Sequence, residues 1–263
     1  MIFTFSLGYI KIVFSFSYLR KVVFKMNFNI QAYKTKGKRL ALAFVCILLL
    51  GSLTACSANV EKRYQTYIKS LIAINYLGAT KDYIEASGAN QEDADALYQS
   101  NIDLLTDNIL TYYSVKIDDA PEMREQFETL AKNIYSKVNY KVDKARKYGS
   151  VYVVDVTVYP INLFAQTSAD VTTYVTTFND AVKAGTYNDY TLAQYETEFA
   201  QGLIDILNAG CENMTYADPQ VVTVEIIEDG NKYYVSDRDF MKIDAAMINS
   251  AIVTETSTST DAE

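Results

Sequence analysis

The sequence contains no histidine, and this absence removes several classes of enzyme mechanism. Its 263 residues also lack tryptophan and include 3 prolines, 10 glycines and 3 cysteines. Histidine is the commonest general base near neutral pH, so Ser-His and Cys-His nucleophile systems are excluded. No glycine pattern suits a phosphate loop or a dinucleotide fold, and Ser-x-x-Lys is missing beyond residue 55.

Carboxylate chemistry remains, because paired Asp and Glu residues hydrolyse glycosides without histidine. The close acid pairs all lie at expected helix N-termini, where negative charge is favourable: Asp93 and Asp95, Asp118 and Asp119, and Asp237 and Asp239. Capping explains these pairs better than catalysis, and they lack the spacing of a calcium loop. We therefore expect no metal site and no cofactor.

A basic stretch followed by a short apolar run indicates an export signal. Four basic residues lie between 34 and 39, and the apolar run covers 40–50. That run is shorter than the ~20 residues that cross a bilayer as a helix. Basic and apolar segments before a small-residue cleavage site are typical of a secretion signal.

The end of this signal, Leu53-Thr54-Ala55-Cys56, resembles the lipobox of bacterial lipoproteins. The resemblance implies that Cys56 becomes the mature N-terminus and carries diacylglycerol on its sulfur, with fatty acyl chains such as palmitate. Two acyl chains, at ~0.8 kcal/mol per buried CH₂, anchor a protein firmly. The expected location is the extracytoplasmic face of the cell membrane, with the lipid bilayer as a partner. The alternative is an ordinary cleavage site beside a coincidental cysteine.

The signal has ordinary length only if translation starts at Met26. Residues 1–25 are then an upstream extension and 26–55 the signal peptide. Alternatively, the apolar run at 2–19 is a separate membrane segment, but Lys11 at its centre costs ~3 kcal/mol there. We expect a lipidated tether at 56–59, an α+β domain at 60–253 with possible halves 60–160 and 161–253, and a disordered tail at 254–263.

Removal of residues 1–55 leaves a strongly acidic chain with one cysteine beyond the anchor. The removed segment holds 8 of the 24 basic residues and none of the 32 acidic ones, so 16 basic and 32 acidic residues remain and the net charge is −16. This charge disfavours nucleic acid as a partner. Cys46 leaves with the signal, and Cys211 has no disulfide partner and no histidine to activate it, so we expect a small buried hydrophobe.

Four helices are predicted in the first half of the domain. Apolar residues recur at helical spacing from Val60 to a stop at Gly78. Thr80 is expected to cap a short second helix that ends at Gly88. Asn90 and Asp93 are expected to form the N-terminal capping pair of a third helix. The fourth, with Asp118 or Asp119 as its cap and Pro121 in its first turn, has the clearest apolar stripe: Met123, Phe127, Leu130, Ala131, Ile134 and Val138.

From Val138 the apolar period changes to two, which predicts a hairpin over 138–159 with its turn at Gly149. Its second strand is apolar on parts of both faces, which favours a central position covered on one side by helices. The second half repeats the plan. Ser168 is expected to cap a helix that ends at Gly185, and Asp189 or Thr191 is expected to start another helix that Gly210 closes.

The chain then returns to strand beyond Pro219, turns at Asp229-Gly230, and ends in a helix capped by Ser236 and Asp239. A helix followed by a hairpin thus occurs at 120–159 and again at 189–236, which is either a structural repeat or convergence on amphipathic spacing. The two hairpins are expected to join as one antiparallel sheet backed by helices.

Nineteen of the 22 tyrosines lie beyond residue 55. A tyrosine ring that faces a cavity offers an apolar wall and a hydroxyl to a ligand, although core packing is the commoner role. The candidates for ligand binding are Tyr98, Tyr112, Tyr140 and Tyr152, with Tyr76 and Tyr113 as further possibilities.

This order of elements resembles the α+β roll of the NTF2-like (cystatin-like) proteins, in which a bent antiparallel sheet wraps helices. The mature chain also resembles surface lipoproteins of Firmicutes without assigned function, chiefly in the hairpin that ends in Val154-Asp155-Val156-Thr157-Val158-Tyr159-Pro160. Such families change their sites while keeping the roll, so the resemblance implies no catalytic residue.

We therefore expect a non-enzymatic, membrane-anchored binding module for a small ligand or a surface partner. A ligand-binding module requires a concave, tyrosine-lined pocket. A protein-interaction or structural lipoprotein instead requires an exposed apolar or acidic patch. A carboxylate-based hydrolase is the third alternative, and it requires two acids that converge in a cleft with a shifted pKa.

Overall fold

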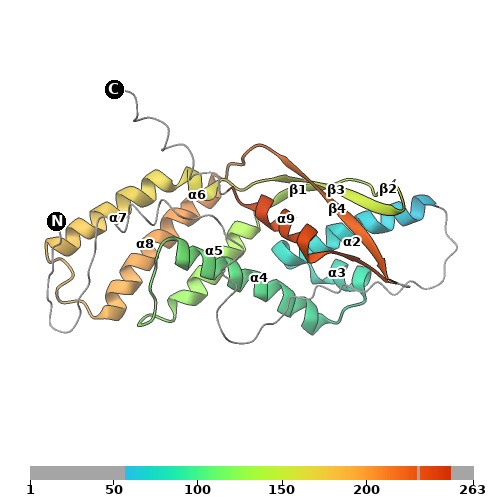
Figure 1. Ribbon diagram of the computed structural model, residues 1–263. Helices are drawn as coiled ribbons and strands as arrows, with labels where there is room; N and C mark the ends of the chain where they lie inside the picture. The colour runs from blue at the N-terminus through green and yellow to red at the C-terminus, as the bar shows by residue number, and fades with distance from the viewer. Residues whose placement is uncertain (1–56, 230–231, 250–263) are drawn as a thin grey trace, which may run out of the picture. The chain divides into compact units, whose positions relative to one another are not determined.

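The computed structural model describes residues 57–229 and 232–249, all within one compact unit (Figure 1). The signal peptide, the lipobox, the residue Gly230 of the second expected turn and the tail at 254–263 lie outside the described residues. The fold is α+β, with a curled antiparallel sheet and several helices.

The four helices expected in the first half are all present. Their bounds are α2 Ser57–Leu77, α3 Thr80–Ser87, α4 Gln91–Tyr112 and α5 Met123–Tyr135. Helix α2 ends before Gly78, whose φ of 65° favours glycine. The helix begins at Ser57, so positions 57–59, expected to be part of the tether, form its first turn. The stripe predicted for α5 is buried up to Ile134, with Met123, Phe127 and Ile134 all 0% exposed, but its last member, Val138, lies beyond the helix and is half-buried.

The capping predictions for these helices are partly confirmed. Asn90 accepts a hydrogen bond from the Asp93 backbone N–H at 2.8 Å, as expected. Thr80 is not a cap, because Ala79 occupies that position and makes no side-chain bond. Neither Asp118 nor Asp119 caps α5; Glu122 holds the N-cap position.

The sheet joins both predicted hairpins, as expected. Its strands are β1 Asn139–Val142, β2 Arg146–Tyr148, β3 Val151–Tyr159, β4 Gln220–Asp229 and β5 Lys232–Val235. All pairs are antiparallel in the order β1-β3-β4-β5, and β2 pairs with β3. The Val154↔Val224 register places β3 and β4 at the centre, so the central position predicted for the second strand of the first hairpin is confirmed.

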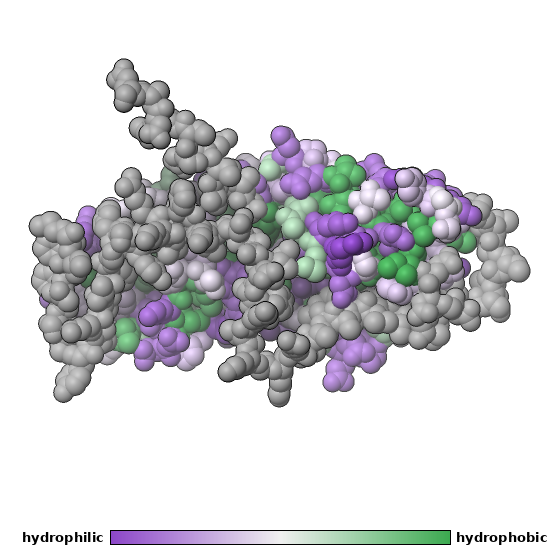
Figure 2. All heavy atoms as spheres, in the orientation of Figure 1, coloured by the Kyte–Doolittle hydropathy of each residue, from purple (hydrophilic) through white to green (hydrophobic). Residues whose placement is uncertain are grey.

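One face of the sheet is covered by helices and the other is open. Val154, Val156 and Val224 on the covered face are 0% exposed, and α2 and α9 pack against β3. Val221 on the open face is 65% exposed. Figure 2 shows hydrophobic and hydrophilic residues side by side on the face that it draws.

The second half adds four helices: α6 Leu163–Gln166, α7 Ser168–Lys183, α8 Leu192–Glu212 and α9 Asp237–Met247. Thr191 and Gln194 form the capping box of α8, so the start at Thr191 is confirmed. Ser168, expected to cap α7, is instead its first helical residue, because Thr167 occupies the N-cap position after the short α6. Gly210 does not close α8 but lies inside it, since the helix continues to Glu212. The missing Cβ makes room for Leu163 and Thr167, whose side chains would lie 2.6 Å from it.

Helix α8 connects the halves, because it packs against α5 on one side and α7 on the other. Asn133 of α5 donates a hydrogen bond to Asn208 of α8 at 2.8 Å. The two helix-hairpin units therefore meet both through α5 and α8 and through β3 and β4. Their origin as a repeat stays a prediction.

Candidate functional site

The four tyrosine candidates have different surroundings. The Tyr98 ring lies against Gly78, and Tyr112 packs on Tyr113 with ring centroids 4.7 Å apart. Tyr140 pairs with Val158 within the sheet. The ring of Tyr152 packs edge-on to Tyr64 at 5.1 Å. The described structure does not gather these four side chains around one cavity, so their role in ligand binding stays a prediction.

Tyr76 belongs to a polar cluster between helices. Its hydroxyl donates a hydrogen bond to a carboxylate oxygen of Asp244 on α9, and its ring packs edge-on to Tyr135 of α5 at 5.1 Å. Burial raises the pKa of the Asp244 carboxyl, and the hydrogen bond from Tyr76 opposes that rise. This cluster joins three helices and has a structural role.

Cys211 is a buried hydrophobe, as expected. It is 1% exposed, and burial raises the pKa of its thiol to about 11. A thiol is nucleophilic as its thiolate, so this environment suppresses reactivity.

One acid pair, Asp237 with Asp239 in α9, lies in a helix first turn as expected. Of the other pairs, Asp93 lies in the first turn of α4 but Asp95 does not, and Asp118 and Asp119 precede α5. The Asp239 backbone N–H donates to the Ser236 hydroxyl at 3.1 Å, which confirms that cap. The Asp239 carboxylate accepts from the Glu225 backbone N–H at 3.1 Å and from Lys242 at 2.6 Å. Its role is to fix α9 to β4.

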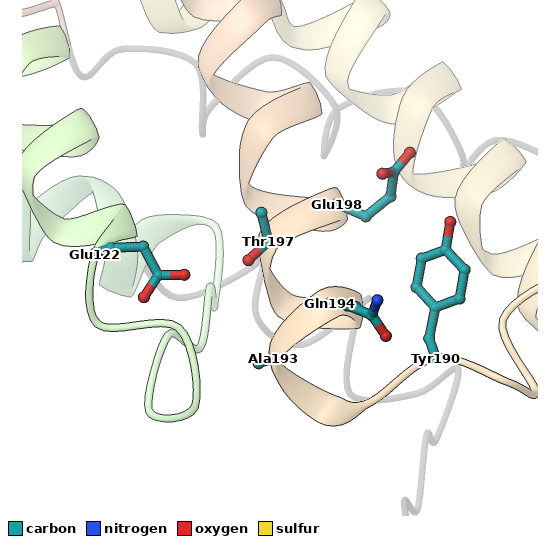
Figure 3. A pocket seen from close by; sticks show the side chains of 6 residues that line it. All are labelled: Glu122, Tyr190, Ala193, Gln194, Thr197 and Glu198. Carbon is teal, nitrogen blue, oxygen red and sulfur yellow. The ribbon is translucent and has the colours of Figure 1, made fainter.

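An open recess of about 340 Å³ lies beside the first turns of α8 (Figure 3). Its lining follows one face of that helix at helical spacing and is completed from the α5 side: Tyr190, Ala193, Gln194, Thr197, Glu198 and Glu122. In Figure 3, Glu198 and Tyr190 lie on one side of α8, and Glu122 faces the helix from the other. The recess thus has acidic walls and a small, neutral floor.

A buried carboxylate contacts the segment that precedes Glu122. Glu196, 6% exposed on α8, accepts a hydrogen bond from the Asp119 backbone N–H at 2.9 Å. This contact holds the segment before α5 against α8. It also uses the backbone of a residue that the sequence suggested as a helix cap.

Aromatic rings form the adjoining end of the α7–α8 pair. The Phe178 ring lies at the centre of this aromatic cluster, with the Tyr187, Tyr195 and Phe199 ring centroids at 4.8, 5.3 and 5.0 Å. Tyr174 and Tyr190 extend it. Phe178 is buried, whereas Tyr190 is 43% exposed. The centre of the cluster is therefore closely packed, and its edge is accessible to solvent.

Backbone contacts hold Tyr174 in this cluster. Its hydroxyl donates to the carbonyls of Glu198 and Phe199 at 3.0 and 3.1 Å. Gly202 makes room for the ring, because a Cβ there would lie 2.3 Å from it. Burial, and then the charge of Glu198, raise the pKa of the Tyr187 hydroxyl.

Sequence reasoning missed Glu122, Tyr190 and Glu198. The signal that could have found the helical wall is the i, i+1, i+4, i+5 spacing of Ala193, Gln194, Thr197 and Glu198 in α8, which places small and polar residues along one face just after Tyr190. The residue that completes the wall, Glu122, is distant in sequence and is brought there by the tertiary fold.

Two features are absent from residues 57–229 and 232–249. No group of three or more Cys, Asp or Glu side chains in that region is arranged to hold a metal ion. No helix there is both long and apolar enough to cross a membrane.

The sequence matches no protein-family model, and no curated protein matches it significantly. Among solved structures, the fold is similar to the crystal structure of a candidate lipoprotein (ycdA) from Bacillus subtilis. The two share 11% sequence identity at a TM-score of 0.52, and the match covers 73% of this chain. The matched region spans 58% of the other protein's length. The similarity shows a shared fold.

Proposed function

We propose that this protein is a lipoprotein, anchored on the extracytoplasmic face of the cell membrane through diacylglyceryl-Cys56, and that its domain is a non-enzymatic binding module for a surface partner. The order of signal and lipobox supports the anchor. The shared fold with a candidate lipoprotein is consistent with it.

The domain is a variant of the NTF2-like (cystatin-like) roll. The curled antiparallel sheet, with α2 and α9 against one face, supports this assignment. Helix side chains pack directly on that face, as Tyr64 of α2 does on Tyr152 of β3 and Tyr233 of β5. The binding surface is therefore sought outside the roll.

The recess beside α8 is the observation that carries the binding function. It is open to solvent, whereas sites for small molecules usually enclose most of the ligand. An open recess beside exposed aromatic rings suits a group that protrudes from a macromolecule. A surface partner is thus favoured over an enclosed small ligand.

The positions of the acids support binding over catalysis. A carboxylate-based hydrolase requires acids with shifted pKa values that face a cleft. Burial raises the pKa of Asp244, but its partner is Tyr76 among the helices and it does not line the recess.

The anchor is tested by changing Cys56→Ala and following incorporation of a labelled fatty acid. We expect the label to disappear and the protein to leave the membrane fraction, while the Cys211→Ala control keeps both. Mass analysis of the wild-type N-terminus is expected to find diacylglyceryl-Cys56. A different mature terminus, or a label that persists in Cys56→Ala, contradicts the anchor.

The binding surface is tested in intact cells by a photo-reactive amino acid at Thr197, in the recess, and at the exposed Thr223 of the open sheet face. We expect a discrete cross-linked product from Thr197 and none from Thr223. Absence of a product at Thr197 contradicts the recess as the binding surface.

A further inference from the structure

We infer that the recess binds a lysine or arginine side chain of a basic polypeptide segment, whose apolar residues lie on the aromatic cluster of Phe178 and its neighbours. This inference rests on the proposed binding function and adds the chemical class of the partner.

The charge of the α7–α8 pair favours a cationic partner. Residues 168–212 contain a single basic residue, Lys183, whose ammonium pairs with Asp180 at 2.7 Å. The same range contains seven acidic residues: Asp170, Asp180, Asp189, Glu196, Glu198, Asp205 and Glu212. Such a field attracts basic segments and repels nucleic acid and anionic lipid.

The two carboxylates of the recess have no cation of their own. Among residues 57–229 and 232–249, neither Glu122 nor Glu198 forms an ion pair. Elsewhere the exposed acids Asp107, Asp143 and Asp180 do pair with Arg or Lys. The recess therefore offers negative charge that the domain does not neutralise.

The shape of the recess fits the end of a long cationic side chain. Ala193 and Thr197 form a floor without charge, with Glu122 on one side and Glu198 on the other (Figure 3). Tyr190, beside Glu198, presents a ring on which an ammonium or guanidinium group gains a cation–π contact. Carboxylates and a ring together distinguish a cation from a neutral polar group.

The exposed apolar side chains of residues 182–192, near the start of α8, define the rest of the partner. Tyr190 is 43% exposed, and Leu192 and Val182 are each 38% exposed. Partly exposed aromatic rings provide large contact areas at low entropic cost. The segment that fits carries lysine or arginine between apolar residues.

The test uses the mature chain with Cys56→Ser, which carries no lipid. The probe is a fluorescein-labelled peptide in which each lysine is separated from the next by leucine and serine. Its counterpart replaces every lysine by glutamine. Binding is measured by fluorescence anisotropy at physiological salt, where distant charges are screened. We expect the lysine peptide to bind and the glutamine peptide to bind at least about tenfold more weakly.

A matched pair of double variants separates the recess from the overall charge. Glu122→Gln with Glu198→Gln is expected to weaken binding of the lysine peptide by about tenfold. Asp205→Asn with Glu212→Gln removes the same charge farther along α8 and is expected to change affinity by less than about twofold. Equal weakening by both double variants, or no binding of the lysine peptide, overturns the inference.

Single variants test the ring and the positioning residue. Tyr190→Phe retains the ring and is expected to bind as the wild type, whereas Tyr190→Ala weakens binding about threefold. Glu196→Ala frees the Asp119 amide and lets Glu122 move, so affinity falls while that amide exchanges faster with solvent. Glu196→Gln keeps an acceptor and restores both readouts. Equal affinity of Tyr190→Ala and Tyr190→Phe contradicts the cation–π contact.

Failure of the inference and failure of the proposed function give different results. A Thr197 cross-link that survives in Glu122→Gln with Glu198→Gln supports a binding surface but not a cationic partner. Loss of that cross-link in the same variant supports both.

Discussion

The sheet with its covering helices and the α7–α8 pair use the same residue types for different ends. Tyr64, Tyr67 and Tyr76 of α2 are each 1% exposed, because α2 lies between the sheet and other helices. The tyrosines of the α7–α8 pair are mostly half-exposed, because α7 packs mainly against α8 and the short α6. A residue covered on two sides contributes to stability, whereas one covered on a single side also remains available to a partner.

The two regions also differ in the extent of packing and hydrogen bonding that stabilises them. Strands β3 and β4 share a continuous register from Tyr152↔Ile226 to Val158↔Gln220. In α7, by contrast, only Val171 and Phe178 are classed as buried. We therefore expect α7 to open locally at a lower free energy than the sheet.

Equivalent truncations in the two regions are the strongest test of this difference in local stability. Phe127→Ala, at 0% exposure in α5, is expected to lower the free energy of unfolding by about 3–5 kcal/mol. Phe178→Ala, at 4% exposure in α7, is expected to lower the global value by less than about half as much and to increase amide exchange mainly in α7 and the start of α8. Urea unfolding and hydrogen exchange measure the two effects. Equal global losses, with uniform exchange, would show that the α7–α8 pair unfolds together with the sheet.

The polar cluster on the sheet side gives the next effect. Asp244→Leu leaves the Tyr76 hydroxyl without its acceptor and is expected to cost about 1–3 kcal/mol, whereas Asp244→Asn retains an acceptor. Because burial raises the folded-state pKa of Asp244 above 3.8, the unfolded chain loses the proton first as the pH rises. The stability of wild type relative to Asp244→Asn should therefore be greatest below pH 3.8 and fall until the raised pKa is passed.

Urea titrations of both proteins across this pH range measure that difference. Asp155→Asn, on the open face of the sheet, serves as a control. Because the pKa of Asp155 is lowered, the stability of wild type relative to this variant should rise with pH instead of falling. A wild-type stability that does not fall relative to Asp244→Asn would contradict a raised pKa.

The smallest effect is expected on the open face of the sheet. Arg146 contacts the Asp155 carboxylate at 3.0 Å, and Thr223 donates to it at 2.6 Å. The Thr223 hydrogen bond and Arg146 hold the pKa of Asp155 below 3.8, so this stabilisation is complete above 3.8 and is lost as the pH falls through the lowered value. The ion pair is partly exposed, so Arg146→Gln should cost no more than about 1 kcal/mol near neutral pH. A loss comparable to that of Phe127→Ala would remove the distinction between the open and covered faces.

The sequence predicted most elements well because its apolar periods are strong. The α5 stripe and the alternation of β3 follow from burial on one face, and Asn90, Thr191 and Ser236 cap helices by local bonds. The wrong predictions concern positions whose role depends on packing against residues distant in the sequence, and an element too short to be recognised. Gly210 serves close packing of α8 against Leu163 and Thr167 rather than the end of the helix, and α6 is too short to show a period.

The recess was less accessible to sequence reasoning than the fold. Cys211 was correctly expected to be buried, because its solitary position and the absence of histidine are properties of the chain. The tyrosine candidates were chosen by residue type, and burial then gave them separate neighbours. Glu122 and Glu198 are 76 positions apart by their numbers, and no periodicity joins them.

Periodicity, charge and short motifs are local properties, so the α+β class, most helix and strand positions, the excess of acid and the expectation of a lipid anchor could be inferred from the sequence. Which acids stand without a cation, and which rings remain exposed, depends on the tertiary structure. Glu196 accepts a hydrogen bond from the Asp119 backbone N–H at 2.9 Å, and Glu122 lines the same recess as Glu198. These contacts join residues more than 70 positions apart, which no local pattern encodes.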